Sequence, residues 1–557
     1  MTFSPKQSLV RISWHARRPR KDPRPSLFEM VIRAMLNQAL FVTLMLVFTY
    51  LFFETCLGEP TSIAIATETI EVTPSEPMPP LPLESALPAS TEAVEENAAQ
   101  KEHLESNRLT TTAAHFRVKL DVKGSLVAPT GKDSQAVTLP IDIAARYDYL
   151  QTHTTCHAKE SPKDSQDPPI IREYRTAVAD VRIDGHAEQI SLASDARMLV
   201  LSLKEVRVTP YLPNAYLTRS ERELLSVHFD SAILDQILIK SSTKHSQPHN
   251  TWDIPHEVVA GLLLIDTVDS GVLEARVTPS DTGGSSLVLS GVITGAIDGS
   301  STTLTVQAAF QYADKQPSAE TLQSLSATIR ESRTASHVAP GLELEARIDL
   351  IREHTLDESE ELGRWLASIE PVRTAVLSFT DTSDSRTQLT SDSVFIRRTG
   401  KGSPGLTWHL DPEKHFDIVY ESRWHEIEDL PRGFILRLID RGALVSQCSV
   451  AMLPPVPIDA VPTVKDVQRD IERSLGAQFG IFEESEESKR PDGTTVIRVT
   501  STGTAEELPF RWIHYVLISD QGKRISVSFM TESSMQKRFE TADRSLVNGI
   551  EFLEISP

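Results

Sequence analysis

The sequence predicts an α+β protein with four parts: a single N-terminal membrane helix, a disordered stalk, an antiparallel β-rich domain and a C-terminal α/β sandwich with an antiparallel sheet. Three observations predict this organisation. An apolar run follows a basic arm, a Pro- and Glu-rich segment follows the run, and alternating apolar and polar residues recur beyond Thr111. With 557 residues, the chain is long enough for two or three domains.

The charge and cysteine content exclude several classes of protein. The chain holds 56 Lys and Arg against 77 Asp and Glu, a net charge of -21. A body this acidic is a poor binder of phosphates, so we expect no nucleic-acid partner. Three cysteines are too few for a disulfide scaffold, a Cys-rich zinc ribbon or a ferredoxin.

The N-terminal segment predicts a membrane anchor. Residues 1–33 form a basic arm of net charge +6, and residues 39–53 carry no charge. Residues 34–57 are predicted to form a transmembrane helix or signal anchor, because about 20 apolar residues span a bilayer core. The basic arm should stay in the cytoplasm and the body should cross, which gives a single-pass protein of the inner (cytoplasmic) membrane.

Two alternatives to an uncleaved anchor stay open. One is a signal peptide that starts at Met30 rather than Met1 and releases a secreted body, although Glu54, Thr55 and Cys56 offer no small-residue cleavage site. The other is a buried soluble helix, although the run has no polar face.

Residues 58–110 predict a disordered linker. Seven prolines fall between Pro60 and Pro88, and ten glutamates fall between Glu59 and Glu105. Such a segment cannot bury enough apolar surface to offset the entropy of ordering it. We expect it to act as a stalk or a tolerated spacer between membrane and body.

Residues 111–355 predict a β-rich domain with a small helical insert. Residues 116–122 alternate between apolar and charged side chains, and Asp298-Gly299 predicts a hairpin between the strands at 287–297 and 303–312. Thr218 and Glu221 form a capping box at the start of a helix. Residues 256–265 are predicted as a short helix or a buried strand. Further strands are predicted at 139–145, 172–184, 197–208, 321–331 and 342–351.

Residues 356–429 predict a connecting segment with strands at 374–380 and 393–398, and residues 430–557 predict the last domain. In that domain Thr463 caps a helix that Gly476 ends. A final helix from Ser533 places Phe539 in the middle of its apolar stripe. Strands are predicted in the stretch 434–450 and at 495–501, 511–518, 524–530 and 550–553.

Residues 430–553 resemble the PsbP-like and DcrB-like α/β sandwich family. The resemblance rests on the order of elements and on the stretches LRLIDRGALVSQCSV, VKDVQRDIERSLG and WIHYVLISDQGKRISVSF. It implies a non-catalytic accessory or adaptor role. The whole chain resembles uncharacterised envelope proteins of planctomycete-type bacteria, a similarity that supplies no activity. The lack of an N-x-S/T sequon also favours a bacterial envelope.

Three motifs carry metal-type ligands. Asp381 to Ser385 match D-x-S-x-S, a pattern that suits Mg²⁺, but the strand–helix alternation that such a site needs is missing, so a solvated loop is favoured. A second group comprises His153, Cys156 and His157, and a third comprises His245, His249 and His256. Neither supplies the two ligand pairs of a structural zinc site, and a surface loop is favoured for both.

The segment RWHEIED holds the densest polar and aromatic patch. Glu426, Glu428 and Asp429 lie beside Trp424 and His425, so an acid–base pair is one interpretation. Alternating strand residues with a solvated face are the favoured one. Two further expectations are that Trp512 and His514 share a packed face, and that Cys448 is buried and inert.

The sequence therefore predicts no catalytic, cofactor-binding or metal-binding residues, and no cofactor. We expect a membrane-anchored extracytoplasmic protein that binds a partner or an apolar ligand in the cell envelope without catalysis. Two other functions stay open: a secreted or anchored hydrolase without a recognisable motif, and a structural subunit of an envelope complex.

Overall fold

The computed structural model describes residues 111–553 apart from twelve short gaps. These are 129–136, 155–169, 205–206, 235–250, 280–283, 314–321, 336–339, 357–359, 378–397, 431–432, 458–459 and 506. The basic arm, the apolar run and the linker lie outside the described residues. Within the described ranges, no helix is both long and apolar enough to cross a membrane.

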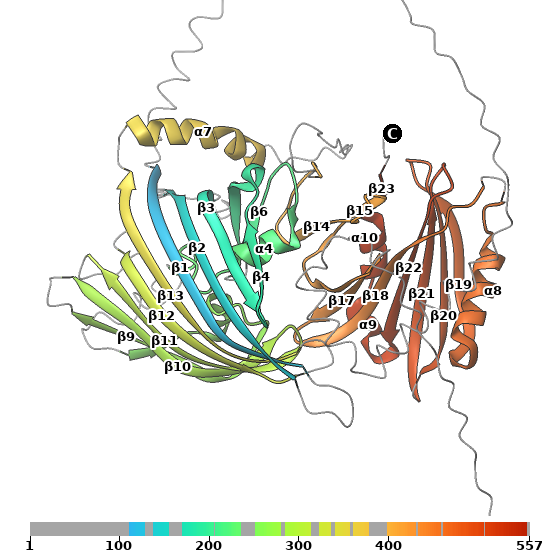
Figure 1. Cartoon of the computed structure of the whole chain (residues 1–557), viewed down its shortest axis with the longest axis horizontal. Coiled ribbons are helices and arrows are strands. Elements are labelled where there is room, and N and C mark those ends of the chain that lie inside the picture. Colours follow the sequence, from blue (N-terminus) through green and yellow to red (C-terminus); the bar gives the residue numbers. More distant parts are fainter. Residues whose placement is uncertain are drawn as a thin grey trace, which may run out of the picture.

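The fold is β-rich, with antiparallel sheets and few helices, as the sequence predicts (Figure 1). A twelve-stranded sheet has the order β6-β5-β3-β2-β1-β13-β12-β11-β10-β9-β8, with β4 paired to β3. Its strands are β1 (Thr111–Ala128), β2 (Val137–Thr154), β3 (Ile170–Ile183), β4 (His186–Ser191), β5 (Met198–Lys204), β6 (Arg207–Tyr211), β8 (Thr251–Asp253), β9 (Thr267–Pro279), β10 (Ser285–Ile297), β11 (Ser300–Tyr312), β12 (Leu322–Arg333) and β13 (Gly341–Leu356).

The local signals for this sheet are confirmed. Asp298 and Gly299 adopt φ values of 49° and 73° and connect β10 to β11, as a tight hairpin requires. The single strand predicted at 197–208 is wrong, because two short strands, β5 and β6, lie there and pair with each other.

The sheet is curved, and its inner face holds the main core (Figure 1). Phe116, Val118 and Val122 of β1 point to this face and are buried. The helices α4 (Arg219–Leu225) and α6 (His256–Leu262) contribute apolar side chains to the same core. Residues 256–262 are therefore helical, which settles the alternative that the sequence left open.

A third helix, α7 (Glu360–Leu377), corrects the strand predicted at 374–380, since residues 374–377 are helical. It contributes Leu362, Trp365 and Ile369 to a separate small core with Ala113 and Leu150 of the twelve-stranded sheet. Those three positions follow helical spacing. The helix lies across the ends of the strands in Figure 1.

A four-stranded sheet connects the two larger sheets. Its order is β23-β15-β14-β7, with β7 (Leu217–Thr218), β14 (Leu406–Leu410), β15 (Phe416–Glu421) and β23 (Ile550–Phe552). The strand β7 directly precedes α4, and it pairs in parallel with β14 through Leu217↔Thr407 and Thr218↔Trp408. Segments about 190 residues apart in the chain therefore share one sheet.

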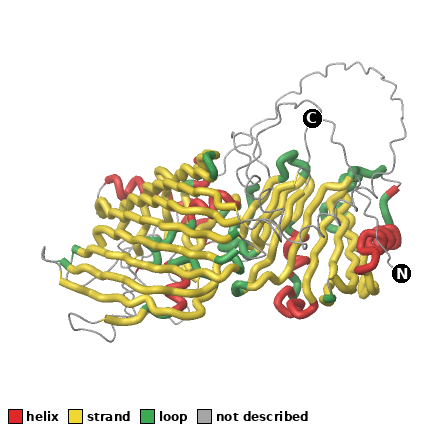
Figure 2. The backbone as a smooth tube through the Cα atoms, turned by 60° about the horizontal axis from the view of Figure 1, so that its bottom comes forward, coloured by secondary structure: helices red, strands yellow, loops and turns green. Residues whose placement is uncertain are grey.

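The third sheet has seven antiparallel strands in the order β16-β17-β18-β22-β21-β20-β19, flanked by helices (Figure 2). The strands are β16 (Trp424–Leu430), β17 (Gly433–Asp440), β18 (Ala443–Leu453), β19 (Phe479–Lys489), β20 (Thr495–Ala505), β21 (Leu508–Ile518) and β22 (Arg524–Glu532). The helix α8 (Val464–Leu475) packs on the face that carries Trp512 and Val516. The helices α9 (Gln536–Phe539) and α10 (Ala542–Asn548) pack on the opposite face.

Two details of this region differ from the sequence predictions. The strand β19 was not predicted, because beyond Phe482 its residues are polar and exposed on both faces and show no alternation. The final helix is not continuous, since Glu540 adopts φ 49° between α9 and α10. Phe539 is nevertheless buried, as predicted.

Candidate functional site

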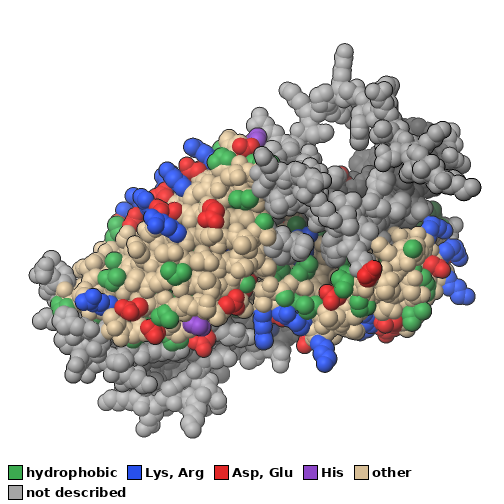
Figure 3. Space-filling view, turned by 90° about the horizontal axis from the view of Figure 1, so that it is seen from below, with side chains coloured by type: hydrophobic (Ala, Val, Ile, Leu, Met, Phe, Trp, Pro, Cys, Tyr) green, Lys and Arg blue, Asp and Glu red, His purple; other side chains and the backbone are tan. Residues whose placement is uncertain are grey.

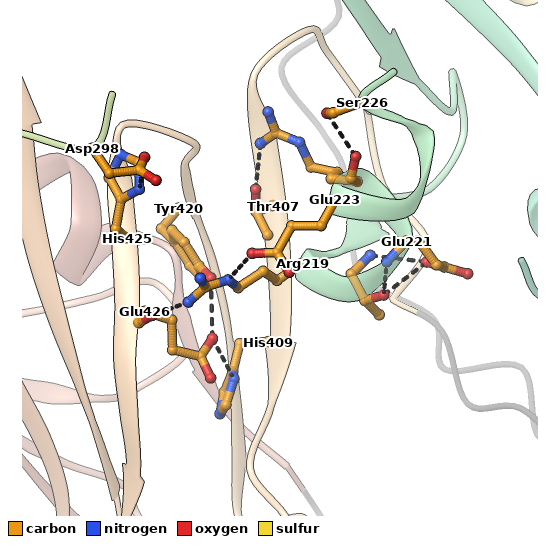
Figure 4. A network of polar contacts seen from close by, with 12 residues as sticks. Arg219, Glu221, Glu223, Ser226, Asp298, Thr407, His409, Tyr420, His425 and Glu426 are labelled. Atoms are coloured by element: carbon orange, nitrogen blue, oxygen red, sulfur yellow. Dashed lines mark hydrogen bonds and ion pairs between the residues drawn. The ribbon is translucent and has the colours of Figure 1, made fainter. Parts of the chain in front are cut away.

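A buried polar cluster lies where α4 meets the four- and seven-stranded sheets (Figure 4). We call it the inter-sheet cluster. Its members come from α4, β14, β15 and β16, and they are Arg219, Arg222, Thr407, His409, Tyr420 and Glu426. It contains Glu426, the residue that the sequence suggests for acid–base chemistry.

Glu426 lies on the buried face of β16, with Trp424 two residues before it. Its Oε2 atom lies 3.2 Å from Nδ1 of His409, and Tyr420 donates its hydroxyl to the same oxygen at 3.3 Å. The predicted strand is confirmed as β16, but the prediction that Glu426 lies on a solvated face is wrong. The Glu426 side chain points inward, where His409 and Tyr420 bind its carboxylate.

His409 is held between this carboxylate and an aromatic ring. Its ring centroid lies 4.3 Å from that of Phe434. Burial and the neighbouring Glu426 carboxylate raise the pKa of Tyr420, so its phenol stays protonated and donates. A carboxylate that orients an imidazole is part of many hydrolytic sites, but here the ring packs against Phe434 and is largely buried.

The helix α4 supplies the arginines of the cluster. Thr218 and Glu221 form the predicted capping box, which fixes where the helix begins. Arg219 then reaches the backbone carbonyl of Glu426, and Arg222 donates to Oγ1 of Thr407. Arg219 and Arg222 therefore connect α4 to β16 of the seven-stranded sheet and to β14 of the four-stranded sheet.

A second contact between sheets lies at the β10–β11 turn. Oδ1 of Asp298 is 3.2 Å from Nδ1 of His425, and Oδ2 is 3.4 Å from Arg333. The carboxylate of Asp266 accepts a hydrogen bond from the backbone N–H of Asp298 at 2.8 Å. Burial, together with the Asp298 charge, raises the pKa of Asp266, although Arg207 opposes the shift.

Arg172 forms the most buried ion pair of the twelve-stranded sheet. Its guanidinium binds both carboxylate oxygens of Asp230, at 2.7 and 2.8 Å, and Nε donates to Gln151 at 3.0 Å. It also stacks 4.2 Å above the Tyr149 ring and donates to Tyr174. A buried charge needs this degree of pairing, and the result is that the segment carrying Asp230 is fixed to the inner face.

A small cavity lies beside this pair. It has a volume of about 10 Å³, and its lining includes Arg172, Tyr147, Tyr149, Tyr174 and Asp230. A water molecule needs roughly 10–15 Å³, whereas pockets for drug-sized ligands measure about 300–1,000 Å³. The cavity therefore suits one water molecule.

Asp417 forms a third buried cluster, in β15. Its carboxylate accepts from Arg398 at 3.1 Å and from the indole of Trp408 at 2.9 Å. Burial raises the pKa of Asp417 from 3.8 to about 6, while Arg398 opposes the shift. Arg398 also binds the carbonyl of Gly549 and the carboxylate of Glu551, so the cluster joins the end of the chain to β15.

The other sequence candidates are not brought together among the described residues. Asp381 to Ser385, Cys156, His157, His245 and His249 lie outside them, and only the backbone of His153 is described. His256 begins α6, and its Nε2 lies 3.2 Å from the carbonyl of Gly271. Within the described ranges no group of three or more His, Cys, Asp or Glu residues has the geometry to hold a metal ion.

Three expectations for the last sheet have clear outcomes. Trp512 and His514 are both buried and lie on the face that α8 covers. Burial lowers the pKa of His514 to about 4, so its ring is neutral at physiological pH. Cys448 is fully buried, and burial raises the pKa of its thiol, which makes it unreactive, as predicted.

Sequence reasoning missed the pairs Arg172–Asp230 and His409–Glu426. Each pair joins residues on separate elements, 58 and 17 positions apart, and no spacing rule links them. One signal was available: Arg172 and Glu426 each stand at a position where the strand alternation calls for an apolar residue.

No family model and no curated protein matches the sequence. Among solved structures, the chain is similar to the cyanobacterial PsbP protein CyanoP from a Synechocystis species, with 15% identity and a TM-score of 0.23. This match covers 27% of this chain and 93% of that one. A structure of lipovitellin matches with 9% identity and a TM-score of 0.26, covering 44% of this chain and 26% of that one.

A protein from Bacteroides thetaiotaomicron matches with 11% identity and a TM-score of 0.20, covering 27% of this chain and 48% of that one. All three scores are low, so no argument about function rests on these likenesses. The likeness to a PsbP protein agrees in kind with the resemblance seen in the sequence. The resemblance to planctomycete-type envelope proteins finds no support in these comparisons.

Proposed function

We propose that the chain is a membrane-anchored extracytoplasmic protein of the bacterial cell envelope that binds a partner protein without catalysing a reaction. The main support is the environment of Glu426. Its carboxylate binds His409 and Tyr420, and its carbonyl binds Arg219, so both groups serve a buried contact between sheets. The best acid–base candidate among the described residues thus contributes to the architecture.

A partner protein fits the described residues better than an apolar ligand does. The inner face of the curved sheet is covered by the chain's own side chains, among them Leu224, Phe229, Ile233 and Leu262, all buried. The cavity beside Arg172 accommodates about one water molecule. Binding would therefore use the outer surface of the body.

The contacts between sheets suit such a role. The pairing of β7 with β14, the inter-sheet cluster and the His425–Asp298 contact hold the sheets together at three places. A preorganised surface loses little conformational entropy on binding. A body fixed in this way therefore suits recognition by surface shape.

A reporter fusion tests the location. Alkaline phosphatase depends on disulfides that form outside the cytoplasm, so a fusion after residue 110 should be active. A fusion after residue 33 is the matched control and should be inactive. An inactive phosphatase after residue 110, together with a fluorescent cytoplasmic reporter at the same position, would contradict the extracytoplasmic assignment.

Cross-linking in native membranes tests the binding claim. We expect lysines of the body to become linked to a second polypeptide in a fixed ratio, as identified by mass spectrometry. Links between copies of this chain alone would contradict a partner protein. A stoichiometric set of many envelope subunits would instead support the structural-subunit alternative.

A further inference from the structure

One part of the outer face of the twelve-stranded sheet carries no charge. The strands β10 and β11 together contain no Asp, Glu, Lys, Arg or His, in a chain where 24% of residues are charged. Burial alternates along both strands, so every second side chain points outward. These outward residues are Ser286, Val288, Ser290, Val292, Thr294, Ser301, Thr303, Thr305, Gln307, Ala309 and Gln311.

The uncharged region extends only in part onto the neighbouring strands, because Glu274 and Arg276 of β9 are exposed opposite Ser290 and Val288, and Arg330 of β12 is exposed opposite Thr305. Val272 of β9 pairs with Val292, and Ser326 and Thr328 of β12 pair with Ala309 and Gln307. We call this combined surface the uncharged face. It includes three of the most exposed large apolar side chains among the described residues: Val272, Val288 and Val292 are 50%, 39% and 51% exposed.

The rest of the outer face has the opposite character. Arg117 binds Asp148 and Glu353 there, and Glu345 binds Arg330 and Arg347. Figure 3 shows this side of the molecule, with a broad area of uncharged side chains and more charged ones toward its margins. Charge is therefore absent from β10 and β11 and present on the strands to either side.

Exposed sheet faces of soluble proteins usually carry charge, whereas the centres of protein interfaces are depleted of it. The length of β10 and β11, 13 residues each, gives the face about 44 Å along the strands. The two wholly uncharged strands give about 10 Å across, or roughly 440 Å². Two such faces would bury about 900 Å², which is below a standard interface and within the range of weak, transient contacts.

We propose that the uncharged face is a self-association surface, on which a second copy of this chain docks. Electrostatics favours a second copy as the occupant. Each chain carries a net charge of -21, so two copies repel one another wherever their charged surfaces meet. A twofold contact brings a surface against itself, and the uncharged face is a region that meets its own copy without like-charge repulsion.

This inference does not depend on the proposed function, because a chain with or without a partner protein can self-associate. Its test is the mass of the full-length chain in detergent, measured by sedimentation equilibrium with the detergent matched in density. We expect a dimer. A wild-type chain that stays monomeric at the highest concentration reached would overturn the proposal and favour another occupant of the face.

Charge substitutions locate the surface. Val292→Glu should weaken the dimer at least tenfold, because a twofold axis brings the two new carboxylates near each other. Thr305→Glu, at the paired position on β11, should do the same, and it remains informative if Val292→Glu fails to fold. Val137→Glu is the matched control, since Val137 is 41% exposed and lies outside the uncharged face.

The melting temperature of each variant is recorded alongside its mass. Monomeric Val292→Glu and Thr305→Glu chains with a dimeric Val137→Glu chain would support the proposal. If the two face variants stay dimeric while their melting temperatures are unchanged, the dimer forms elsewhere and the assignment of this face is overturned.

Discussion

The Oε2 atom of Glu426 lies 3.2 Å from the Nδ1 atom of His409, and this contact joins β16 of the seven-stranded sheet to β14 of the four-stranded sheet. Tyr420, on β15, donates to the same oxygen. Three strands thus meet at one buried carboxylate. Because the group is desolvated, its loss leaves its donors without an acceptor, and the cost falls on stability.

Glu426→Ala should lower the free energy of unfolding by about 1–3 kcal/mol, since the His409 and Tyr420 donors lose a buried acceptor. Glu421→Ala is the control, because Glu421 pairs with Arg423 on the exposed surface, where an ion pair contributes about 0–1 kcal/mol. Urea denaturation followed by circular dichroism measures both. Equal losses in the two variants would contradict the structural role of Glu426.

Arg172→Met should cost about 3–5 kcal/mol, because it leaves the Asp230 carboxylate buried without its cation. The double variant Arg172→Met with Asp230→Asn should recover part of that loss, since no charge is then left unpaired. Arg175→Met, at an exposed residue 3.7 Å from Glu361, should change stability by less than about 0.5 kcal/mol. A double variant as unstable as the sum of its parts would show that the pair is not coupled.

Asp417 predicts a pH dependence with a definite sign. Its pKa is raised in the folded state, from 3.8 to about 6, so the folded chain binds this proton more tightly than the unfolded chain does. The contribution of this group to stability is present below pH 4 and is lost as the pH rises toward 6. Above about pH 7 the group is ionised in both states and adds no further pH dependence.

Asp417→Asn should remove that dependence, because an amide does not titrate and can still accept from Trp408. Relative to the variant, the wild type should lose about 2 kcal/mol of stability between pH 4 and pH 6. Urea denaturation at several pH values measures the difference. Parallel profiles for the two chains would show that burial does not raise this pKa.

Phe539→Ala should cost about 3–5 kcal/mol, since the ring is buried between α9 and the sheet, with its centroid 5.8 Å from that of Phe529. Leu508→Ala is the control, because Leu508 is 48% exposed and should tolerate the change within about 0.5 kcal/mol. The melting temperature of the full chain distinguishes them. A small loss for Phe539→Ala would mean that α9 adds little to this core.

The strands that the sequence predicts either alternate between buried and exposed residues beside a turn signal, as β10 and β11 do, or form a largely apolar stretch, as β17 and β21 do. The Asp298-Gly299 hairpin and the caps at Thr218 and Thr463 are local features, and the structure confirms all three. In contrast, β7 is only two residues long, and it forms only because β14 provides a partner about 190 residues away in the sequence. Local alternation carries no information about such pairing.

The helix α7 shows a different reason for failure. Its apolar residues Leu362, Trp365 and Ile369 follow helical spacing, so the signal was present. Pro371 within the helix, and the acidic residues before it, indicate a linker when they are read locally. Packing against Ala113 and Leu150 stabilises the helix in spite of the proline.

The polar clusters could not be predicted as clusters. A sequence pattern can place a charged residue on a strand. Which residue of another segment pairs with that charge depends on how the strands are arranged in the folded chain. Glu426 was singled out by composition, whereas its partner His409 lies on another strand and attracts no attention in the sequence. The same holds for Arg172 and Asp230.

The central claim is that Glu426 serves the architecture and performs no chemistry. Its most direct test is the turnover of the purified full-length chain on nitrophenyl esters, phosphate esters and glycosides, compared with Glu426→Gln, with the melting temperature measured on the same samples. We predict no turnover above buffer for either chain, and a lower melting temperature for the variant. Turnover by the wild type that Glu426→Gln abolishes, at an unchanged melting temperature, would contradict the claim.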